Sequence, residues 1–252
     1  VDHFGVGVGA GEDDHGGVHG AALPRFPAAS QGIGPPPRPA PAFTDPRRRA
    51  MMPPMRERWL QSGKRELALR LTSGYALLSV MAFALAVALR EGPPWVHPEP
   101  WFAWPPPLGL VASAALGLGF STTLIGLTRY LVARFSWARR LHVELRPVAR
   151  DLSAGQILLV AGLSSLGEEL LFRGLLTPTG GVVLSGLLFG LAHQIKGPSR
   201  WVWAGWAMTV GLGLGAIFAA TGSLVGPLLC HAIVNAANLV YLRDYDPLDH
   251  AL

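Results

Sequence analysis

Long apolar runs alternate along the chain with short basic or proline-rich segments. Residues 71–89 and 108–128 contain no Asp, Glu, Lys or Arg, and each is close to the roughly 20 apolar residues that a membrane-spanning helix needs. Residues 201–242 are also uncharged but too long for one crossing, and Thr221-Gly222-Ser223 predicts a turn within them. The pattern predicts an all-α polytopic membrane helix bundle of about six transmembrane helices, near residues 71–89, 108–128, 153–176, 181–194, 201–220 and 223–242.

The first 55 residues differ in kind from the rest. They are rich in Gly, Pro, Ala and His and show no hydrophobic periodicity, so we expect a disordered, low-complexity tail ahead of a transmembrane domain at 56–252. The sequence begins with Val1, whereas Met51, Met52 and Met55 directly precede the apolar part. Our hypothesis is that the native product starts near one of these methionines and lacks the tail.

The charge distribution predicts an orientation. Only 15% of residues are charged, against about 25% in soluble domains, and the formal net charge is +5. Basic residues gather before residue 71, in the linker 129–150, around Lys196 and Arg200, and at Arg243. By the positive-inside rule these segments face the cytoplasm, so both termini are expected there, with the loops at 90–107, 177–180 and 221–223 outside.

Composition narrows the compartment and the partners. The abundance of Ala, Arg, Gly and Pro suits a high-GC bacterium, which indicates the bacterial cytoplasmic (inner) membrane. No basic stretch is interleaved with aromatic residues, so nucleic acid is not an expected partner. Cys230, the single cysteine, has no partner for an internal disulfide or a cysteine-type zinc site. The sequence does not indicate an oligomeric state.

Charged residues inside the third predicted span indicate chemistry, because a charge at the bilayer centre costs about 2.5 kcal/mol or more. Glu169 and Arg173 are four residues apart with the acid first, which favours an ion pair on a helix. Glu168 points about 100° away and has no local partner, as expected of a general base. We therefore assign Glu169 and Arg173 to structure and Glu168 to catalysis; helix packing is the alternative for all three.

Two further polar positions follow on later spans. His193 shares a helix face with Phe189, but a lone histidine near the end of a span is equally often an interfacial side chain. His231 and Asn235 lie one helical turn apart, and both can donate hydrogen bonds to an oxyanion. Hydrogen bonding between helices is the alternative for this pair. Estimates of helical rise place Glu168, His193 and His231 near mid-bilayer.

The order EExxxR, FxxxH and HxxxN on successive apolar spans resembles the CPBP family of intramembrane proteases. That family includes type II CAAX prenyl endopeptidases and bacterial relatives linked to bacteriocin immunity (Abi proteins). The resemblance covers about residues 150–242 and no motif residue is missing. It implies that Glu168 and His193 activate a water, that His231 and Asn235 hold the oxyanion, and that the substrate is a membrane-anchored protein or peptide.

The cofactor and the function class each leave an alternative. The family is often described as metalloproteases, and Glu168, His193 and His231 could bind zinc, but the sequence lacks HExxH and every role is filled without a metal. We therefore favour a metal-free mechanism, with no cofactor. The alternative functions are a non-catalytic immunity or scaffold protein of the same fold and a proton-coupled transporter. Against the transporter, the chain shows no paired inverted halves.

Overall fold

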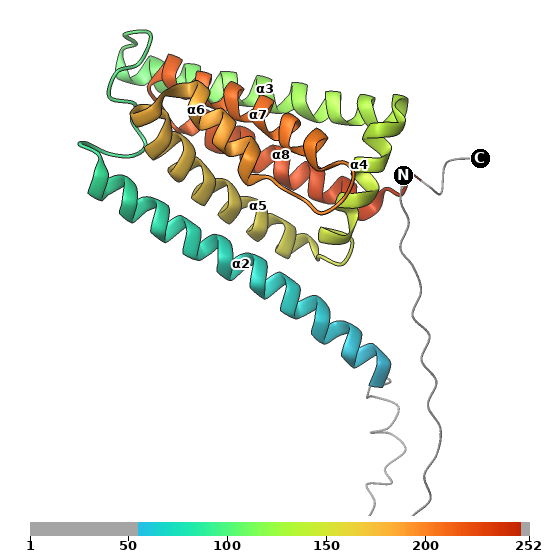
Figure 1. Cartoon of the computed structure of the whole chain (residues 1–252). Helices are drawn as coiled ribbons and strands as arrows, with labels where there is room; N and C mark the ends of the chain where they lie inside the picture. Colours follow the sequence, from blue (N-terminus) through green and yellow to red (C-terminus); the bar gives the residue numbers. More distant parts are fainter. Residues whose placement is uncertain (1–54, 248–252) are drawn as a thin grey trace, which may run out of the picture. The chain divides into compact units, whose positions relative to one another are not determined.

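The computed structural model describes residues 55–247, which form helices joined by loops (Figure 1). The predicted tail lies outside this range, apart from Met55, which begins the first helix. No β-strand occurs between residues 55 and 247; Val96 and Ser223 form an isolated bridge. The helices are α2 (Met55–Leu89), α3 (Pro106–Arg134), α4 (Ser136–Leu145), η1 (Arg146–Val148), α5 (Ala154–Glu168), η2 (Glu169–Leu176), α6 (Thr177–Ala192), α7 (Arg200–Thr221) and α8 (Val225–Asp244).

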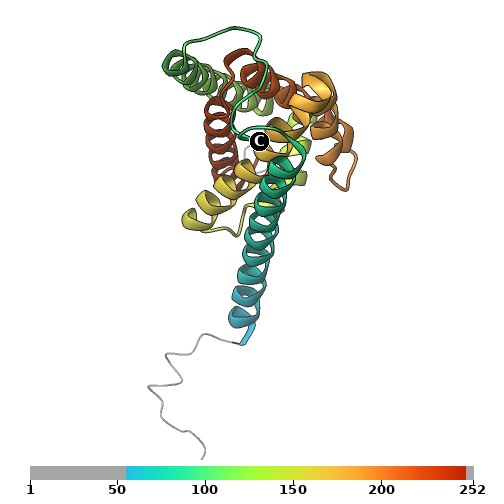
Figure 2. The same ribbon diagram turned by 90° about the vertical axis from the view of Figure 1, so that its left-hand side faces the viewer.

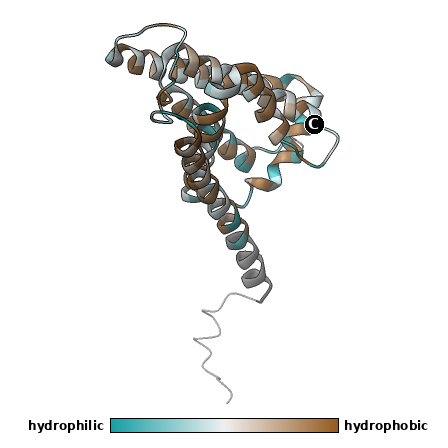
Figure 3. Cartoon of the chain, turned by 60° about the vertical axis from the view of Figure 1, so that its left-hand side comes forward, coloured by the Kyte–Doolittle hydropathy of each residue, from teal (hydrophilic) through white to brown (hydrophobic). Residues whose placement is uncertain are grey.

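The fold predicted from the apolar runs is confirmed. Five helical stretches of the described chain are long and apolar enough to cross a membrane, namely Glu66–Leu89, Pro107–Arg134, Ala154–Ala192, Arg200–Thr221 and Val225–Asp244. Large apolar side chains project outward from them, among them Val80, Leu158 and Val183, which are 65%, 66% and 67% exposed. Figure 3 shows hydrophobic colour along much of these helices. Such a surface suits hydrocarbon, because water would oppose its exposure.

The chain reverses direction at Gly181, so the stretch Ala154–Ala192 consists of two arms. Gly181 has a φ of 83°, and the Ser185 hydroxyl donates to the Phe172 carbonyl at 2.7 Å although the two residues are 13 positions apart. The third and fourth predicted spans are therefore separate arms. The loop predicted at 177–180 is wrong: these residues are helical, because Pro178 lies in the first turn of α6, where proline is tolerated.

The second arm, 182–192, is too short to cross a hydrocarbon core roughly 30 Å thick at about 1.5 Å per residue. It ends at His193, which closes the helix by donating its backbone N–H to Gly190. The loop that follows is tied to α4, since the Ser199 hydroxyl donates to the Glu144 carboxylate at 2.9 Å. This contact fixes where α7 begins relative to His193.

Helix α8 packs against both α3 and α5, α2 lies along α5, and α6 packs on α7 (Figures 1 and 2). The turn between α7 and α8 is the one that the sequence predicted, with Gly222 as a left-handed cap at φ 75°. A capping box of Ser153 and Gln156 begins α5. Helix α4 lies in the basic linker and buries Ala138, Leu141 and His142.

Candidate active site

The two glutamates lie where the α5 helix widens. Glu168 is the last residue of α5, and Glu169 begins η2, a π-helix. Such wide turns free carbonyl groups and are frequent at functional sites. Side chains add to the backbone bonds here: the Phe172 carbonyl accepts from the Thr177 backbone N–H and also from the hydroxyls of Thr177 and Ser185, at 2.9 and 2.7 Å. The Arg90 guanidinium, from the loop after α2, donates to the carbonyl of Gly174.

Glu169 connects three helices at a fully buried position. Its Oε1 accepts from Arg173 Nη1 at 2.9 Å, and both side chains are 0% exposed. The same oxygen accepts from Nδ1 of His231 on α8 at 2.7 Å. Arg173 Nη2 in turn donates to the Gly211 carbonyl of α7 at 3.0 Å. The carboxylate therefore balances the arginine charge and orients the histidine.

The bond between Glu169 and His231 was missed by the sequence analysis, which assigned Glu169 to structure alone. The residues are 62 positions apart, so no local spacing could indicate the contact. The i,i+4 pattern correctly brought Glu169 to Arg173, but a second partner from another helix left no trace in that pattern.

Glu168 faces both histidines. Its Oε2 lies 3.4 Å from Nε2 of His193 and 3.8 Å from Nε2 of His231. These distances are too long for good hydrogen bonds, and Oε2 is buried without a hydrogen-bond partner. Three of the four predicted catalytic side chains thus converge around one carboxylate oxygen, and His193, the least certain of them from sequence, is the closest to it.

The hydrogen bonds of the two histidines fix which ring nitrogen carries the proton. His193 Nδ1 contacts the Phe189 carbonyl at 2.7 Å, and His231 Nδ1 contacts the Glu169 carboxylate. A carbonyl and a carboxylate only accept, so each Nδ1 must donate. In a neutral ring, Nε2 then presents a lone pair toward Glu168. His231 can donate from Nε2 only as an imidazolium, whose charge would lie between the carboxylates of Glu168 and Glu169.

Phe189 forms the apolar wall of the cluster. Its ring centroid is 4.3 Å from that of His193 and 5.8 Å from that of His231. The Arg173 guanidinium lies 4.4 Å from the same centroid, a cation–π distance. An aromatic side chain here excludes water from the ion pair and limits rotation of both imidazoles.

Asn235 is held by a residue that the sequence analysis did not single out. Its Nδ2 donates to the hydroxyl of Ser164 on α5 at 3.0 Å, while that hydroxyl donates to the Ala161 carbonyl at 3.2 Å. If the Asn235 amide were turned over, its Oδ1 would face the Ser164 hydroxyl oxygen, whose hydrogen is already donated to the Ala161 carbonyl. Ser164 therefore fixes the orientation of the amide, and one Nδ2 hydrogen stays available for another acceptor.

Within residues 55–247, no group of three or more His, Cys, Asp or Glu side chains is arranged as a metal-binding cluster. Glu168, His193 and His231 carry the donor atoms that zinc prefers, but two histidine nitrogens facing one carboxylate oxygen do not by themselves form such a cluster.

The segment that carries most of this site matches a known family. Residues 150–237 match the family model described as Type II CAAX prenyl endopeptidase Rce1-like. This segment is therefore similar to an Rce1-like domain. This confirms the resemblance drawn from the motifs, and the matched segment begins just before α5 and ends within α8. No curated protein and no solved structure matches the chain.

Proposed function

We propose that this protein is an intramembrane endopeptidase in which Glu168 activates a water to hydrolyse a peptide bond of a membrane-anchored protein or peptide. The supporting observation is the approach of Nε2 of His193 and of His231 to the unpartnered Oε2 of Glu168, inside an Rce1-like domain. A buried carboxylate oxygen with no hydrogen-bond partner is costly, and a water between it and the histidines would satisfy it.

Hydrolysis would proceed through a tetrahedral intermediate. The Glu168 carboxylate takes a proton from the water while the water oxygen bonds to the peptide carbonyl carbon. The resulting oxyanion accepts hydrogen bonds from the free Nδ2 hydrogen of Asn235 and from the Nε2–H of protonated His231. The C–N bond then breaks, and the proton on Glu168 passes to the leaving amine.

Glu169 and Arg173 support this chemistry without contacting the substrate. Glu169 stabilises the imidazolium of His231, as the aspartate does in a Ser-His-Asp triad. The ion pair with Arg173 neutralises the Glu169 carboxylate, which would otherwise be an unpaired buried charge. His193 orients the water against Glu168, with its own Nδ1 anchored on Phe189.

A zinc-dependent peptidase is the rival mechanism, since Nε2 of His193 and of His231 and Oε2 of Glu168 are zinc donor types. No step above needs a metal. We expect chelators to leave cleavage nearly unchanged. Loss of activity on chelation that returns with added zinc would overturn the metal-free mechanism while leaving the peptidase function intact.

Replacing Glu168 with glutamine tests the function itself. We expect Glu168→Gln to fold and to lower cleavage by about 10²–10⁴-fold, because the amide cannot take up the proton. The assay is comparison of membrane-protein termini in cells carrying active or variant protein, followed by cleavage of the identified peptide in proteoliposomes. Glu91→Gln, at an exposed carboxylate, is the matched control.

The rival functions give different results in the same experiment. A transporter would show Glu168-dependent proton flux and no new protein termini. A non-catalytic scaffold or immunity protein would show neither, and Glu168→Gln would leave its binding unchanged. Equal cleavage by wild type and Glu168→Gln would exclude the proposed mechanism.

A further inference from the structure

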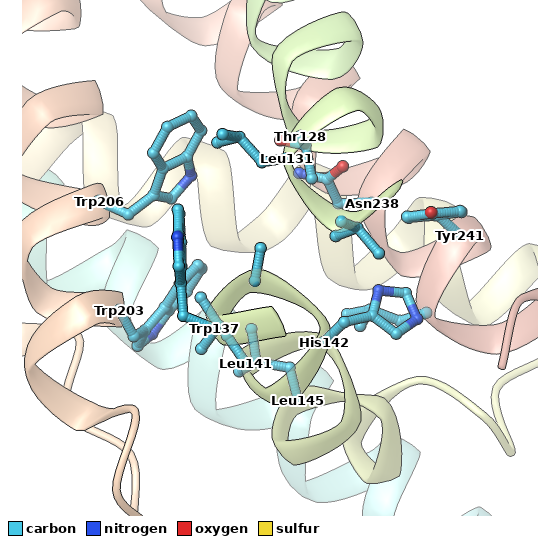
Figure 4. Close-up of a pocket in the computed structure, with 13 residues that line it drawn as sticks. Thr128, Leu131, Trp137, Leu141, His142, Leu145, Trp203, Trp206, Asn238 and Tyr241 are labelled. Atoms are coloured by element: carbon cyan, nitrogen blue, oxygen red, sulfur yellow. The ribbon is translucent and has the colours of Figure 1, made fainter. Parts of the chain in front are cut away.

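An apolar pocket lies between α3, α4, α7 and α8, beyond the active site along α8 (Figure 4). Aromatic side chains from three of these helices line it, including Trp137, Trp203, Trp206 and Tyr241, and Leu141 forms its floor on α4. In Figure 4 these side chains turn toward a common space. Trp and Tyr are enriched where hydrocarbon meets the polar membrane surface, which suits a position beside the basic linker.

The polar atoms of His142 and Asn238 inside the pocket are already hydrogen-bonded, so the interior favours an apolar ligand. His142 Nε2 donates to the Tyr245 carbonyl at 3.0 Å, and Asn238 Oδ1 accepts from Arg129 at 2.7 Å. No lining side chain has a buried nitrogen or oxygen without a hydrogen-bond partner. Burial lowers the pKa of His142, so its ring stays neutral at physiological pH. Such an interior suits a hydrocarbon chain.

The chain next to the opening, by contrast, is basic. Trp137 stands at the opening with 42% of its surface exposed. Arg140 lies three residues after Trp137 on α4, about one helical turn away. Arg134 is the last residue of α3 and lies three residues before Trp137. Both arginines are exposed, and neither has an ion pair within the described residues.

Neighbouring arginines of the linker are already engaged. Arg139 caps backbone carbonyls at the end of α3, Arg146 pairs with Asp246 at 2.9 Å, and Arg150 pairs with Asp151. The Glu144 carboxylate accepts from the backbone N–H and the hydroxyl of Ser199 and forms no ion pair with Arg134 or Arg140. Two free cations beside an apolar opening match a ligand with a hydrocarbon tail and a negative head.

We propose that this pocket binds an acyl chain of an anionic phospholipid of the cytoplasmic leaflet, with the lipid phosphate held by Arg134 and Arg140. Basic sites between helices on the cytoplasmic side are suited to acidic headgroups. The site is distinct from the catalytic cluster but shares a wall with it, because the Trp203 ring packs edge-on against His193 with centroids 5.9 Å apart. A bound chain would hold that wall in place.

Lipid retention by the full-length protein tests the proposal. Protein purified from vesicles of mixed phosphatidylglycerol and phosphatidylcholine should retain phosphatidylglycerol preferentially, measured by native mass spectrometry. Each arginine near an anionic surface contributes about a fivefold preference, so Arg134→Gln with Arg140→Gln should reduce retention by about 25-fold. Arg150→Gln, in the same basic linker but paired with Asp151, is the matched control and should retain the lipid.

The position of the chain needs a second measurement. Phosphatidylglycerol with a photoreactive acyl group should label wild-type peptides containing Trp137 and Trp203. Ala138→Phe, which narrows the pocket, should remove this label; if that variant does not fold, the wild-type labelling decides. Equal retention of both lipids, or labelling only elsewhere, overturns the proposal. Loss of labelling when a membrane-anchored substrate peptide is added would assign the pocket to substrate instead.

Discussion

Helix α8 contacts polar side chains of α3 on one side and of α5 on the other. The two sides differ in how completely the polar atoms are hydrogen-bonded. Toward α3, the Ser113 hydroxyl donates to the Ser223 carbonyl at 2.8 Å and accepts from the Gly226 backbone N–H at 2.9 Å. Gly117 of α3 lies so close to Gly226 that either helix would collide with an added Cβ. Both partners of Ser113 are backbone groups, which need no proton transfer. Further along the same two helices, Arg129 of α3 donates to the Asn238 side chain at 2.7 Å and to the Ala237 carbonyl at 2.8 Å, so the polar atoms on this side are paired.

Toward α5 the polar atoms are charged and only partly satisfied. His231 and Asn235 have one firm bond each, to Glu169 and Ser164, while Oε2 of Glu168 and Oε2 of Glu169 are buried without partners. Buried polar atoms are almost always paired in folded proteins. The difference indicates that the α3 side serves packing, whereas the α5 side keeps unsatisfied atoms for a water or a reacting group.

The largest stability effect is expected at Glu169. Glu169→Gln leaves Arg173 buried without its counter-charge, and removing one partner of a buried pair typically costs about 3–5 kcal/mol. Unfolding in detergent, followed by helical circular dichroism against temperature or denaturant, measures this. The pair Glu66–Arg70 offers a control with the same i,i+4 spacing but exposed side chains.

Glu66→Gln should change the midpoint of unfolding little, because solvent screens an exposed pair. If Glu169→Gln were no more destabilising than Glu66→Gln, the buried carboxylate would not be the counter-charge of Arg173, and the assignment of charges in the site would fail.

An intermediate effect is expected in the α3–α8 seam. In Gly226→Ala the new Cβ would meet the Ser113 carbonyl, which is backbone and cannot move aside, so about 1–3 kcal/mol of stability is lost by overpacking. The same unfolding assay applies. Gly119→Ala, on α3 with nothing within 4 Å of the added atom, should unfold no earlier than wild type. Equal behaviour of the two variants would show that the helices are less closely packed than described.

The smallest effect is expected on kcat, in a comparison of alanine substitutions at the neighbouring residues Ser164 and Ser165. Ser164→Ala removes the acceptor of Asn235, and a hydrogen bond of about 1 kcal/mol corresponds to roughly a fivefold loss in kcat. Ser165→Ala is the matched control, because Ser165 is equally buried but its hydroxyl has no hydrogen-bond partner. Both variants are assayed on the substrate peptide at saturating concentration.

A double-mutant cycle shows whether Ser164 acts through Asn235. In an Asn235→Ala background, Ser164→Ala should cause no further loss of kcat. Additive losses would mean that Ser164 supports the fold rather than the amide, and an effect of Ser165→Ala as large as that of Ser164→Ala would lead to the same conclusion.

Much of this molecule follows from local sequence alone. The uncharged runs predict helices that face lipid, because burying charge in hydrocarbon costs far more than a folded chain can spare. The spacing of Glu169 and Arg173 brings them together on any helix, and Gly222 ends α7 where the sequence places a turn. The order of the three motifs was sufficient to indicate the family.

Only the tertiary structure decided which polar atoms meet. Ser164 and Asn235 are 71 positions apart, and His231 reaches Glu169 across 62. The π-helix at Glu169 and the reversal at Gly181 bring His193 back to Glu168, whereas the sequence placed the break at 177–180. Spacing along a chain fixes the face of one helix, but the register between helices depends on the close packing of all of them. The tasks of the neighbours Ser164 and Ser165 are therefore distinguished only in three dimensions, and so is the second partner of Glu169.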